Sequence, residues 1–504
     1  MNTANRVAIN TIVQYTRLIL NLIIALVSVR IILNALGASD YGVYDVVGGV
    51  IALLGFLNSS LSQTSIRYLS VSLGKNNLSI LRETFNNSFW LHFLISALIV
   101  IVLEIVGVYI FDGFLNIPSN RIYAAKVIYH CMVATTFFQI VVTPFQALII
   151  SHEKFVYTSV VAILDSVLKL MIAIVLTITT EDKLIVYGVL MAIVTVLNVV
   201  LYISYLLLKY RHELYIGMPH VKGIKGQSSF AGWTVMDIMG SMLNRQGYAI
   251  MLNKFFGTTV NATFAIARQI EGQIYCVSAA VIDTMKPQIM KSYGANDVER
   301  MFRLSMTAGK LGFTMMSIVC IPLLVYMPEI LALWLVKVPA GTEIVARLLV
   351  CACMMEQITR GLVYANQATG KIKWFSIIVS VVRVMALPLS VVFCLMGCPV
   401  EVAIVTYFVC ESLASFSRVI VMSKVHGMDA NLFYKECFIK IVPPFLISII
   451  VCYVLKMLTS GLLCLLLVSA FTGIVYLTLS YFVGLSDFEK QITKGIVSSV
   501  KKRL

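Results

Sequence analysis

Stretches of roughly 20 mainly apolar residues recur along the whole chain, separated by shorter polar segments. A helix of about 20 residues crosses the roughly 30 Å hydrocarbon core of a membrane. A transmembrane β-barrel would instead need strands of about 10 residues with strict polar–apolar alternation, which these stretches lack. The pattern predicts an all-α polytopic membrane protein with about 14 transmembrane helices, at 11–33, 42–63, 88–110, 122–149, 156–179, 184–208, 229–252, 261–284, 303–327, 343–368, 373–396, 400–422, 441–458 and 462–484.

The composition excludes a water-soluble globule. Of the 504 residues, 59% are hydrophobic and 12% are charged, whereas a typical soluble protein has about 25% charged residues. The 11 cysteines and 6 histidines show no metal-ligand spacing, and the sequence has no phosphate-binding loop. We therefore predict no metal, cofactor or ATP site, and an ion gradient or the membrane potential is the expected energy source.

The Lys and Arg residues between the apolar stretches predict the orientation of the helices. Most of them fall on alternate connections, such as 64–87 and 209–228. Because positively charged loops stay in the cytoplasm, both termini are predicted to be cytoplasmic. The start of the chain, MNTANRVAIN, has no signal-cleavage pattern, so the first apolar stretch is predicted to be a retained helix. The net charge of +15 is mostly a topology signal, and no nucleic-acid partner is predicted.

The sequence also contains a weak internal repeat at an offset of 220 residues. The matching positions are Gly37 with Gly257, Thr64 with Thr284, Ser72 with Ser292, Gly74 with Gly294, and Asn76 with Asn296. Six helices per repeat give both halves the same orientation, which predicts two lobes related by a pseudo-two-fold axis along the membrane normal. Helices 13 and 14 fall outside the repeat. The predicted divisions are an N-terminal lobe at 1–208, a cytoplasmic lobe linker at 209–228, a C-terminal lobe at 229–424, helices 13 and 14 at 425–485, and a basic cytoplasmic tail at 486–504.

Polar and charged residues share one face of several predicted helices. Helix 1 carries Asn10, Gln14, Arg17, Asn21 and Ser28. Helix 7 carries Thr234, Asp237, Ser241, Asn244, Arg245 and Tyr248. Helix 8 carries Arg268, Glu271, Tyr275 and Ser278. A charge near the bilayer centre costs about 2.5–3.5 kcal/mol, so these faces predict a water-filled cavity lined by apparently unpaired arginines. The alternative, which the Asn and Ser residues favour, is that these groups hold neighbouring helices together.

Other intramembrane charges have simpler interpretations. Two pairs have the i, i+4 spacing of an intrahelical salt bridge, and Glu411 and Arg418 share a face of helix 12; the two pairs are Glu356 with Arg360 and Asp165 with Lys169. Arg383 has no local partner, which predicts that it faces the cavity. Cationic groups exceed carboxylates over the predicted spans, and guanidinium groups bind phosphate oxygens in pairs. The cavity is therefore predicted to prefer anions such as phosphate, diphosphate or acidic sugars.

Several segments resemble polysaccharide-transport proteins. These segments are NALGASDYGVYDVVGGVIALLGFLNSSLSQTSIRYLS, FFGTTVNATFAIARQIEGQI, ILALWL and NQATGKIKW. They resemble the O-antigen and capsule repeat-unit (Wzx-type) flippases of the multidrug/oligosaccharidyl-lipid/polysaccharide (MOP) exporter superfamily, over nearly the whole chain. The resemblance implies a MATE-like fold with two lobes that open alternately to either side of a bacterial inner membrane.

The same resemblance implies a substrate and a set of site residues. The substrate would be an oligosaccharide repeat unit linked to undecaprenyl diphosphate, moved to the periplasmic leaflet for O-antigen, capsule or exopolysaccharide assembly, with membrane lipids and glycan polymerase or assembly proteins as partners. Related lipid II flippases use an Arg-x-x-Glu on helix 8, which Arg268 and Glu271 match, and a helix 1 arginine, to which Arg17 is similar. The expected substrate-binding residues are Arg17, Arg245, Arg268, Arg383, Asn21 and Tyr275. The expected protonatable coupling residues are Glu271 and Asp237.

Three other functions stay open on the sequence alone. A multidrug or cation antiporter of the same fold would need an acidic cavity. A membrane O-antigen polymerase or ligase would need a sizeable outer loop with catalytic groups, whereas the predicted outer loops are short and carry no catalytic motif. A scaffold protein of glycan assembly would leave the intramembrane charges unexplained. A secondary-type transporter, not an enzyme, is therefore the prediction.

Overall fold

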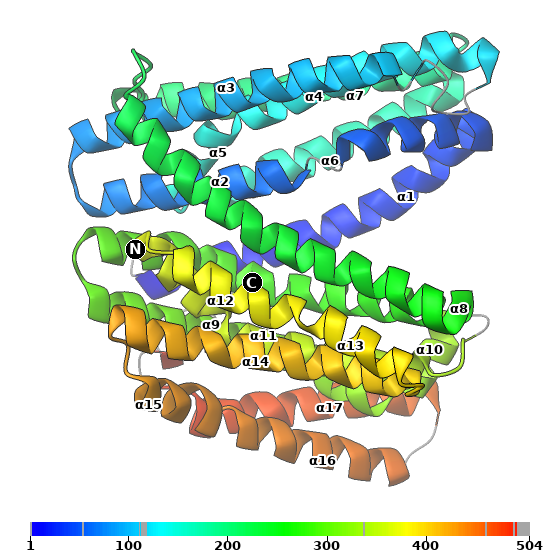
Figure 1. Cartoon of the computed structure of the whole chain (residues 1–504), viewed down its shortest axis with the longest axis vertical. Helices are drawn as coiled ribbons and strands as arrows, with labels where there is room; N and C mark the ends of the chain where they lie inside the picture. Colours follow the sequence, from blue (N-terminus) through cyan, green and yellow to red (C-terminus); the bar gives the residue numbers. More distant parts are fainter. Residues whose placement is uncertain are drawn as a thin grey trace. The chain divides into compact units, whose positions relative to one another are not determined.

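The computed structural model describes residues 3–52, 55–109, 111, 118–335, 338–458, 461–486 and 489–490. These residues form helices joined by short connections, with no β-strand among them, so the predicted all-α fold class is confirmed (Figure 1). Eleven described segments are long and apolar enough to cross a membrane. The predicted spans 42–63, 229–252 and 261–284 are not among these eleven; they fall on helical arms with more polar faces. The chain is a multi-pass membrane protein.

The helices pack into two units, which we call the N-terminal unit (Ile12–Val235) and the C-terminal unit (Met1–Thr11 with Met236–Leu504). Most of the kinked helix α1 and the helices that follow it, as far as the start of α8, belong to the N-terminal unit. Their bounds are α1 (Thr3–Ala52), α2 (Gly55–Gly74), α3 (Leu78–Tyr109), α4 (Ile122–Val141), α5 (Thr143–Ser151), α6 (Phe155–Ile178), α7 (Lys183–Lys209) and α8 (Val221–Gly294).

Small residues let the helices of the N-terminal unit approach closely. Helix α4 packs against both α3 and α7. A Cβ atom on Gly107 would lie 2.5 Å from the ring of Tyr129, and one on Gly188 would lie 2.9 Å from Ile128. Tyr129 and Ile128 are fully buried at the centre of this packing. Glycine thus makes room for the large side chains of α4, as is common between membrane helices.

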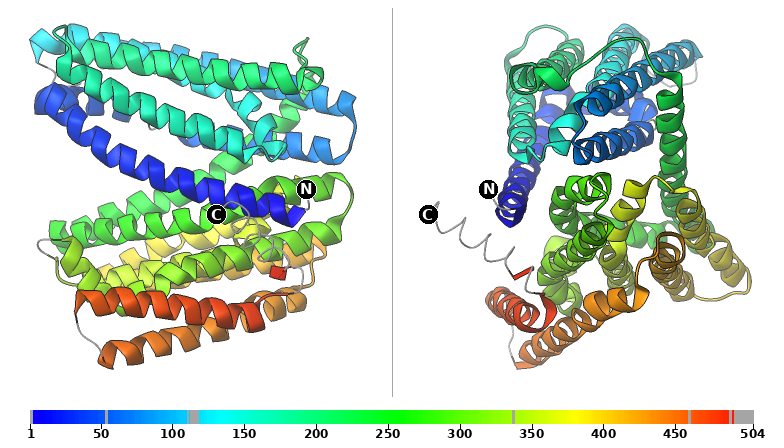
Figure 2. Two further views of the ribbon diagram at one scale, coloured as in Figure 1. Left: turned by 180° about the vertical axis from the view of Figure 1, so that it is seen from behind. Right: turned by 90° about the vertical axis from the view of Figure 1, so that its left-hand side faces the viewer.

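The C-terminal unit continues from α8 with helices that pack around α9, α11 and α14. Their bounds are α9 (Val298–Val325), α10 (Met327–Trp334), α11 (Thr342–Thr369), α12 (Lys373–Val384), α13 (Ala386–Leu395), α14 (Val400–His426), α15 (Ala430–Phe433), α16 (Val442–Leu458) and α17 (Leu462–Leu479). The backbones of α9 and α11 nearly touch, because a Cβ atom on Gly361 would lie 1.9 Å from the carbonyl oxygen of Ser305. Helices α16 and α17 lie side by side against α9 (Figure 2).

Matching backbone features recur in the two units at the offset of 220 residues. Helix α1 kinks at Gly37 (φ 77°, ψ 164°), and α8 kinks at Gly257 (φ 83°, ψ −176°). Only glycine adopts this backbone region readily. Asn76 and Asn296 both have left-handed backbones, with φ 51° and 59°. The repeat seen weakly in the sequence is therefore also a repeat of local structure.

The helices that follow these turns begin at the same offset. Helix α3 starts at Leu78 and α9 at Val298. Their first turns are capped alike: the Asn77 side chain accepts a hydrogen bond from the N–H of Ile80, and the Asp297 side chain accepts one from the N–H of Arg300.

The predicted lobe linker at 209–228 is fastened to the N-terminal unit. The Asn86 side chain donates to the carbonyl of Met218 (2.9 Å) and accepts from the N–H of Gly217 (2.9 Å). The Trp90 ring nitrogen donates to the carbonyl of Gly217 (2.7 Å). These bonds hold the middle of the segment on α3, so it is not a free tether.

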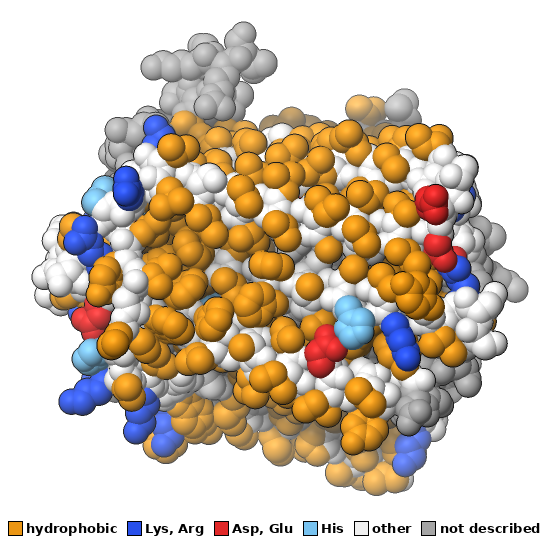
Figure 3. All heavy atoms as spheres, turned by 90° about the horizontal axis from the view of Figure 1, so that it is seen from above, with side chains coloured by type: hydrophobic (Ala, Val, Ile, Leu, Met, Phe, Trp, Pro, Cys, Tyr) orange, Lys and Arg blue, Asp and Glu red, His pale blue; other side chains and the backbone are white. Residues whose placement is uncertain are grey.

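The outer surface of the described helices suits a lipid environment. Figure 3 shows a broad belt of hydrophobic side chains with charged groups gathered mainly toward its two ends. Exposed apolar residues follow the outer faces of α3 and α7, among them Leu98, Ile101, Ile105 and Ile193. A soluble protein rarely exposes apolar patches of this extent, whereas the hydrocarbon core of a membrane requires them.

The predicted basic tail at 486–504 falls mostly outside the described residues. Its described start forms a reciprocal cap, in which the N–H of Ser486 donates to Glu489 Oε2 (2.8 Å) and the N–H of Glu489 donates to Ser486 Oγ (3.4 Å). Glu489 is buried, and its carboxylate lies 2.7 Å from Nζ of Lys310 on α9. The start of the tail is thus anchored in the C-terminal unit.

Candidate functional site

Three arginines converge on one carboxylate inside the C-terminal unit. Glu356 Oε1 on α11 lies 2.9 Å from Arg360 Nη1 of the same helix, 3.1 Å from Arg418 Nη2 of α14, and 3.6 Å from Arg383 Nη2 of α12. We call Arg360, Arg383 and Arg418 the arginine cluster. The sequence explained two of these charges as local pairs on single helices. The structure shows instead that Arg418 crosses from α14 to Glu356 on α11.

Arg383 is also held by groups from two other helices. Its Nε lies 3.0 Å from Glu411 Oε1 of α14, its Nη1 donates to Ser241 Oγ of α8 (2.6 Å), and the same Nη1 is 4.0 Å from Asp237 Oδ1. The Asn244 side chain adds a hydrogen bond to Glu411 (3.4 Å). The Arg383 side chain is only 6% exposed, so it pairs inside the unit, contrary to the expectation that it faces a cavity.

Arg268 and Glu271 lie one turn apart on α8 and form an ion pair. Arg268 Nη1 also donates to the hydroxyl of Tyr407 on α14 (3.0 Å). The expectation that Arg268 is unpaired is therefore wrong. Its side chain keeps 16% of its surface exposed, and that of Glu271 keeps 10%. The Arg245 side chain, on the first arm of α8, is exposed and close enough to Glu271 to act on it electrostatically.

Tyr275 connects the second arm of α8 to the arginine cluster. Its hydroxyl accepts a hydrogen bond from Arg360 Nη2 (2.7 Å), and the Arg360 guanidinium lies 5.3 Å from the centre of its ring. Farther along the helix, Asp283 accepts a hydrogen bond from Tyr364 (2.8 Å). Lys286 is buried, with Nζ 5.0 Å from the Tyr364 ring. Polar contacts therefore run along one side of α8 for several turns.

Another stripe of α8 is exposed and carries small or polar side chains. It consists of Ala262, Ala265, Gln269, Gly272 and Gln273. A surface against lipid tails favours large apolar side chains, as on α3 and α7. This stripe is therefore better suited to water or to a polar ligand.

The predicted helix 1 residues lie in the N-terminal unit. Asn21 accepts a hydrogen bond from Ser166 of α6 (3.1 Å), and Gln14 and Ser28 are buried. These three residues fit the alternative in which polar groups join helices. Arg17 is half-buried and close enough to Tyr202 of α7 to interact with it electrostatically.

Of the predicted site residues, the structure brings together Arg268 with Glu271 and Asp237 with Arg383. Sequence reasoning did not assign Glu356, Glu411 or Tyr407 to the site. The available signal was that the carboxylates of α11 and α14 each sit near several arginines in helical wheels, but their true partners depend on packing between helices. Among the described residues, no group of three or more His, Cys, Asp or Glu side chains forms a metal site.

Comparisons with known proteins identify the fold. No protein-family model matches the sequence, and no curated protein matches it. Among solved structures, a MATE protein in its bent conformation is similar with a TM-score of 0.72 at 13% identity, covering 86% of this chain and 96% of that chain. A MOP superfamily transporter from Pyrococcus furiosus is similar with a TM-score of 0.67 at 12% identity, covering 82% and 93%. The MATE transporter ClbM, in complex with Rb+, is similar with a TM-score of 0.66 at 14% identity, covering 85% and 96%. The chain therefore has the fold of MATE transporters of the MOP superfamily.

Proposed function

We propose that the protein is a flippase that moves a lipid-linked oligosaccharide, carried on undecaprenyl diphosphate, from the cytoplasmic to the periplasmic leaflet of a bacterial inner membrane. The transporter fold supports translocation across the membrane by alternating access. The observation that carries the proposed substrate is the accessible positive charge on α8 of the C-terminal unit. A diphosphate needs such a site, because its negative charges must be neutralised once they leave water.

The pairing inside the C-terminal unit makes this accessible charge positive. The carboxylates of Glu356 and Glu411 are occupied by the buried arginine cluster. Arg245 is exposed and forms no ion pair with the described carboxylates, and Arg268 reaches the surface beside it. Because guanidinium groups bind phosphate oxygens in pairs, these two arginines are the proposed phosphate contacts. Arg383 has a positioning role, since it joins α12, α14 and α8.

Glu271 offers a way to couple binding to a proton. In the structure its carboxylate pairs with Arg268, so a phosphate must compete with it for the same guanidinium. Protonation of Glu271 would remove this competition and free Arg268 for the substrate. Asp237, at the edge of the arginine cluster, is the second proposed coupling group. A proton gradient would then change the affinity for the diphosphate.

A multidrug or cation antiporter is the second candidate, because MATE structures with that description share the fold. The Pyrococcus furiosus transporter is described as having a binding pocket of reversed polarity, so the polarity of the pocket varies among proteins of this fold. An organic cation would be repelled by exposed Arg245 and Arg268. The positive surface on α8 is thus the reason to favour an anionic substrate.

The test is a complementation experiment in a host strain that lacks the gene. We expect lipid-linked repeat units to accumulate on the cytoplasmic leaflet and to be cleared by the wild-type protein. Arg268→Ala should lower the flipping rate about 10- to 100-fold, the effect of losing one or two hydrogen bonds to a charged group. The matched control is Arg303→Ala, which removes an arginine whose partner, Glu299, is exposed at the start of α9.

Membrane levels of each variant are measured by quantitative immunoblotting, so that loss of protein is separated from loss of activity. Normal flipping by Arg268→Ala would refute the site assignment. A deletion strain with an unchanged lipid-linked pool, together with increased sensitivity to cationic drugs, would refute the flippase and favour the antiporter. Single repeat units that reach the periplasm without being joined would favour the polymerase.

A further inference from the structure

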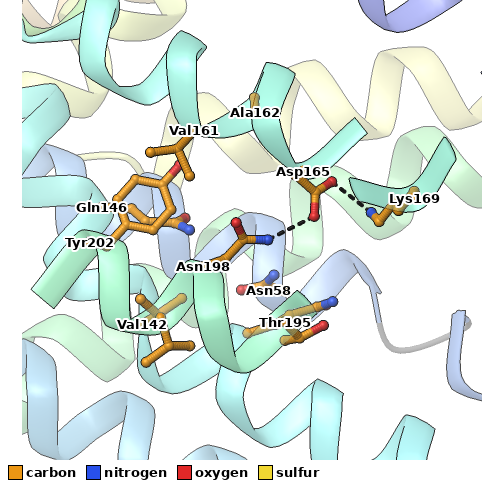
Figure 4. Close-up of a pocket in the computed structure, with 12 residues that line it drawn as sticks. Asn58, Val142, Gln146, Val161, Ala162, Asp165, Lys169, Thr195, Asn198 and Tyr202 are labelled. Carbon is orange, nitrogen blue, oxygen red and sulfur yellow. Dashed lines mark hydrogen bonds and ion pairs between the residues drawn. The ribbon is translucent and has the colours of Figure 1, made fainter. Parts of the chain in front are cut away.

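The N-terminal unit contains a polar cavity of about 310 Å³, about the space of ten water molecules. It lies among α2, α4, α5, α6 and α7, and Figure 4 shows side chains from these helices around one space. None of its lining residues belongs to the expected substrate-binding set. The polar groups that line it are Asn58, Gln139, Gln146, Asp165, Lys169, Thr195, Asn198 and Tyr202.

The lining carries almost no net charge. Asp165 and Lys169 of α6 form an ion pair of 2.7 Å and neutralise each other. The other polar groups are four carboxamides and two hydroxyls. Carboxamides both donate and accept hydrogen bonds, and hydroxyls do the same. An ionic ligand would find no matching charge here, and an apolar ligand would leave these buried groups unpaired, at about 1–3 kcal/mol each.

Asn198 is held in one orientation and leaves an acceptor free for a ligand. Its Nδ2 donates to Asp165 Oδ1 (2.7 Å), and a carboxylate can only accept, so the amide nitrogen must face Asp165 (Figure 4). The Asn198 Oδ1 atom is then buried with no hydrogen-bond partner among the described residues. A ligand that supplies an O–H or N–H donor would satisfy it.

We propose that this cavity binds a neutral sugar residue. A hexose ring has the size of the cavity and carries hydroxyl groups around its edge, each of which pairs with a carboxamide or hydroxyl of the lining. The ring of Tyr202 supplies an apolar surface at one wall. The inference rests on the proposed function in one respect: the sugar is taken to be part of the lipid-linked oligosaccharide. It assigns recognition of the glycan to the N-terminal unit, separately from the phosphate contacts on α8.

Binding is tested by saturation-transfer NMR on the full-length protein in lipid nanodiscs. The probes are the methyl glycosides of glucose, galactose and N-acetylglucosamine at millimolar concentration. We expect at least one probe to receive saturation from the wild type. Asn198→Leu, which keeps the side-chain volume but removes the amide, should reduce that signal about tenfold, as expected for the loss of one to two hydrogen bonds.

Two further variants guard against a folding defect or non-specific binding. Thr195→Val removes one lining hydroxyl with little change in shape and should weaken the same probe. Gln269→Leu removes an exposed amide on α8 and should leave the signal unchanged. Saturation that is absent for all three probes, or that is equal in the wild type and Asn198→Leu at equal thermal stability, would overturn the proposal and leave the cavity filled by water.

The flipping assay separates this inference from the proposed function. If Arg268→Ala abolishes flipping while no glycoside binds, the sugar site is wrong and the flippase stands. If a glycoside binds in an Asn198-dependent way but the lipid-linked pool is unchanged on deletion, the sugar site stands and the flippase is wrong. If Asn198→Leu slows flipping and Arg268→Ala still binds the glycoside, both are supported.

Discussion

At the scale of single residues, Glu356 is the carboxylate on which the C-terminal unit depends most. Its Oε1 atom is the common acceptor for side chains from α11, α12 and α14. A buried carboxylate that neutralises several guanidinium groups cannot be removed without leaving uncompensated charge in a low-dielectric interior. The cluster therefore has a structural consequence that is independent of any substrate.

We predict that Glu356→Gln lowers the free energy of unfolding by about 3–5 kcal/mol, because three buried guanidinium groups lose their shared counter-charge. The control is Glu299→Gln, which breaks an ion pair with Arg303 in which Glu299 is 85% exposed, and which should change stability by less than about 1 kcal/mol. SDS-titrated unfolding of the purified proteins, followed by tryptophan fluorescence, measures both. Equal stabilities of the two variants would show that the cluster is solvated.

At the scale of elements, the kinks in α1 and α8 are set by single glycines. Gly257 has φ 83° and ψ −176°, and a Cβ atom there would meet nothing within 4 Å, so any penalty comes from the backbone alone. We predict that Gly257→Ala lowers the free energy of unfolding by about 1–3 kcal/mol. Gly272→Ala on the same helix also meets nothing within 4 Å but has ordinary helical geometry, and it should be neutral or stabilising.

Thermal unfolding in detergent, with the two variants prepared in parallel, decides this prediction. A lower unfolding temperature for Gly257→Ala alone supports backbone strain at the kink. The same shift in both variants would mean that α8 tolerates no added methyl group on its open surface, and the strain argument would fail. Gly37→Ala in α1 is expected to behave like Gly257→Ala, since the two backbones match.

These elements also show how far the sequence reaches. The apolar stretches and the offset of 220 residues predicted the helices and the matching turns, because hydrophobic length and glycine conformation are local properties. The partner of Arg383 was not predictable in the same way, because Glu411 lies on another helix and the contact depends on how α12 packs on α14. The polar cavity around Asn198 was missed for the same reason: its lining comes from five helices.

At the scale of the whole molecule, the last helices have no counterpart in the repeat and need their own attachment. Helices α16 and α17 pack on α9 through an apolar cluster that includes Ile321, Cys452 and Tyr476. Two buried or half-buried ion pairs add to it. Lys456 of α16 lies 2.6 Å from Glu329 of α10, and Lys310 of α9 lies 2.7 Å from Glu489 beyond α17.

The Lys310–Glu489 pair gives the last prediction, because both side chains are at most 3% exposed. Lys310→Met should lower the free energy of unfolding by about 3–5 kcal/mol, since it leaves Glu489 charged and buried. Glu489→Gln should have a smaller effect, because Lys310 keeps Glu436 at 3.6 Å. The double variant should be less destabilised than the sum of the two, which a double-mutant cycle measures. The exposed Arg347–Glu343 pair is the control cycle, with an expected coupling of about 0.5 kcal/mol or less. Additive effects at Lys310 and Glu489 would mean that the start of the tail is not held by this ion pair.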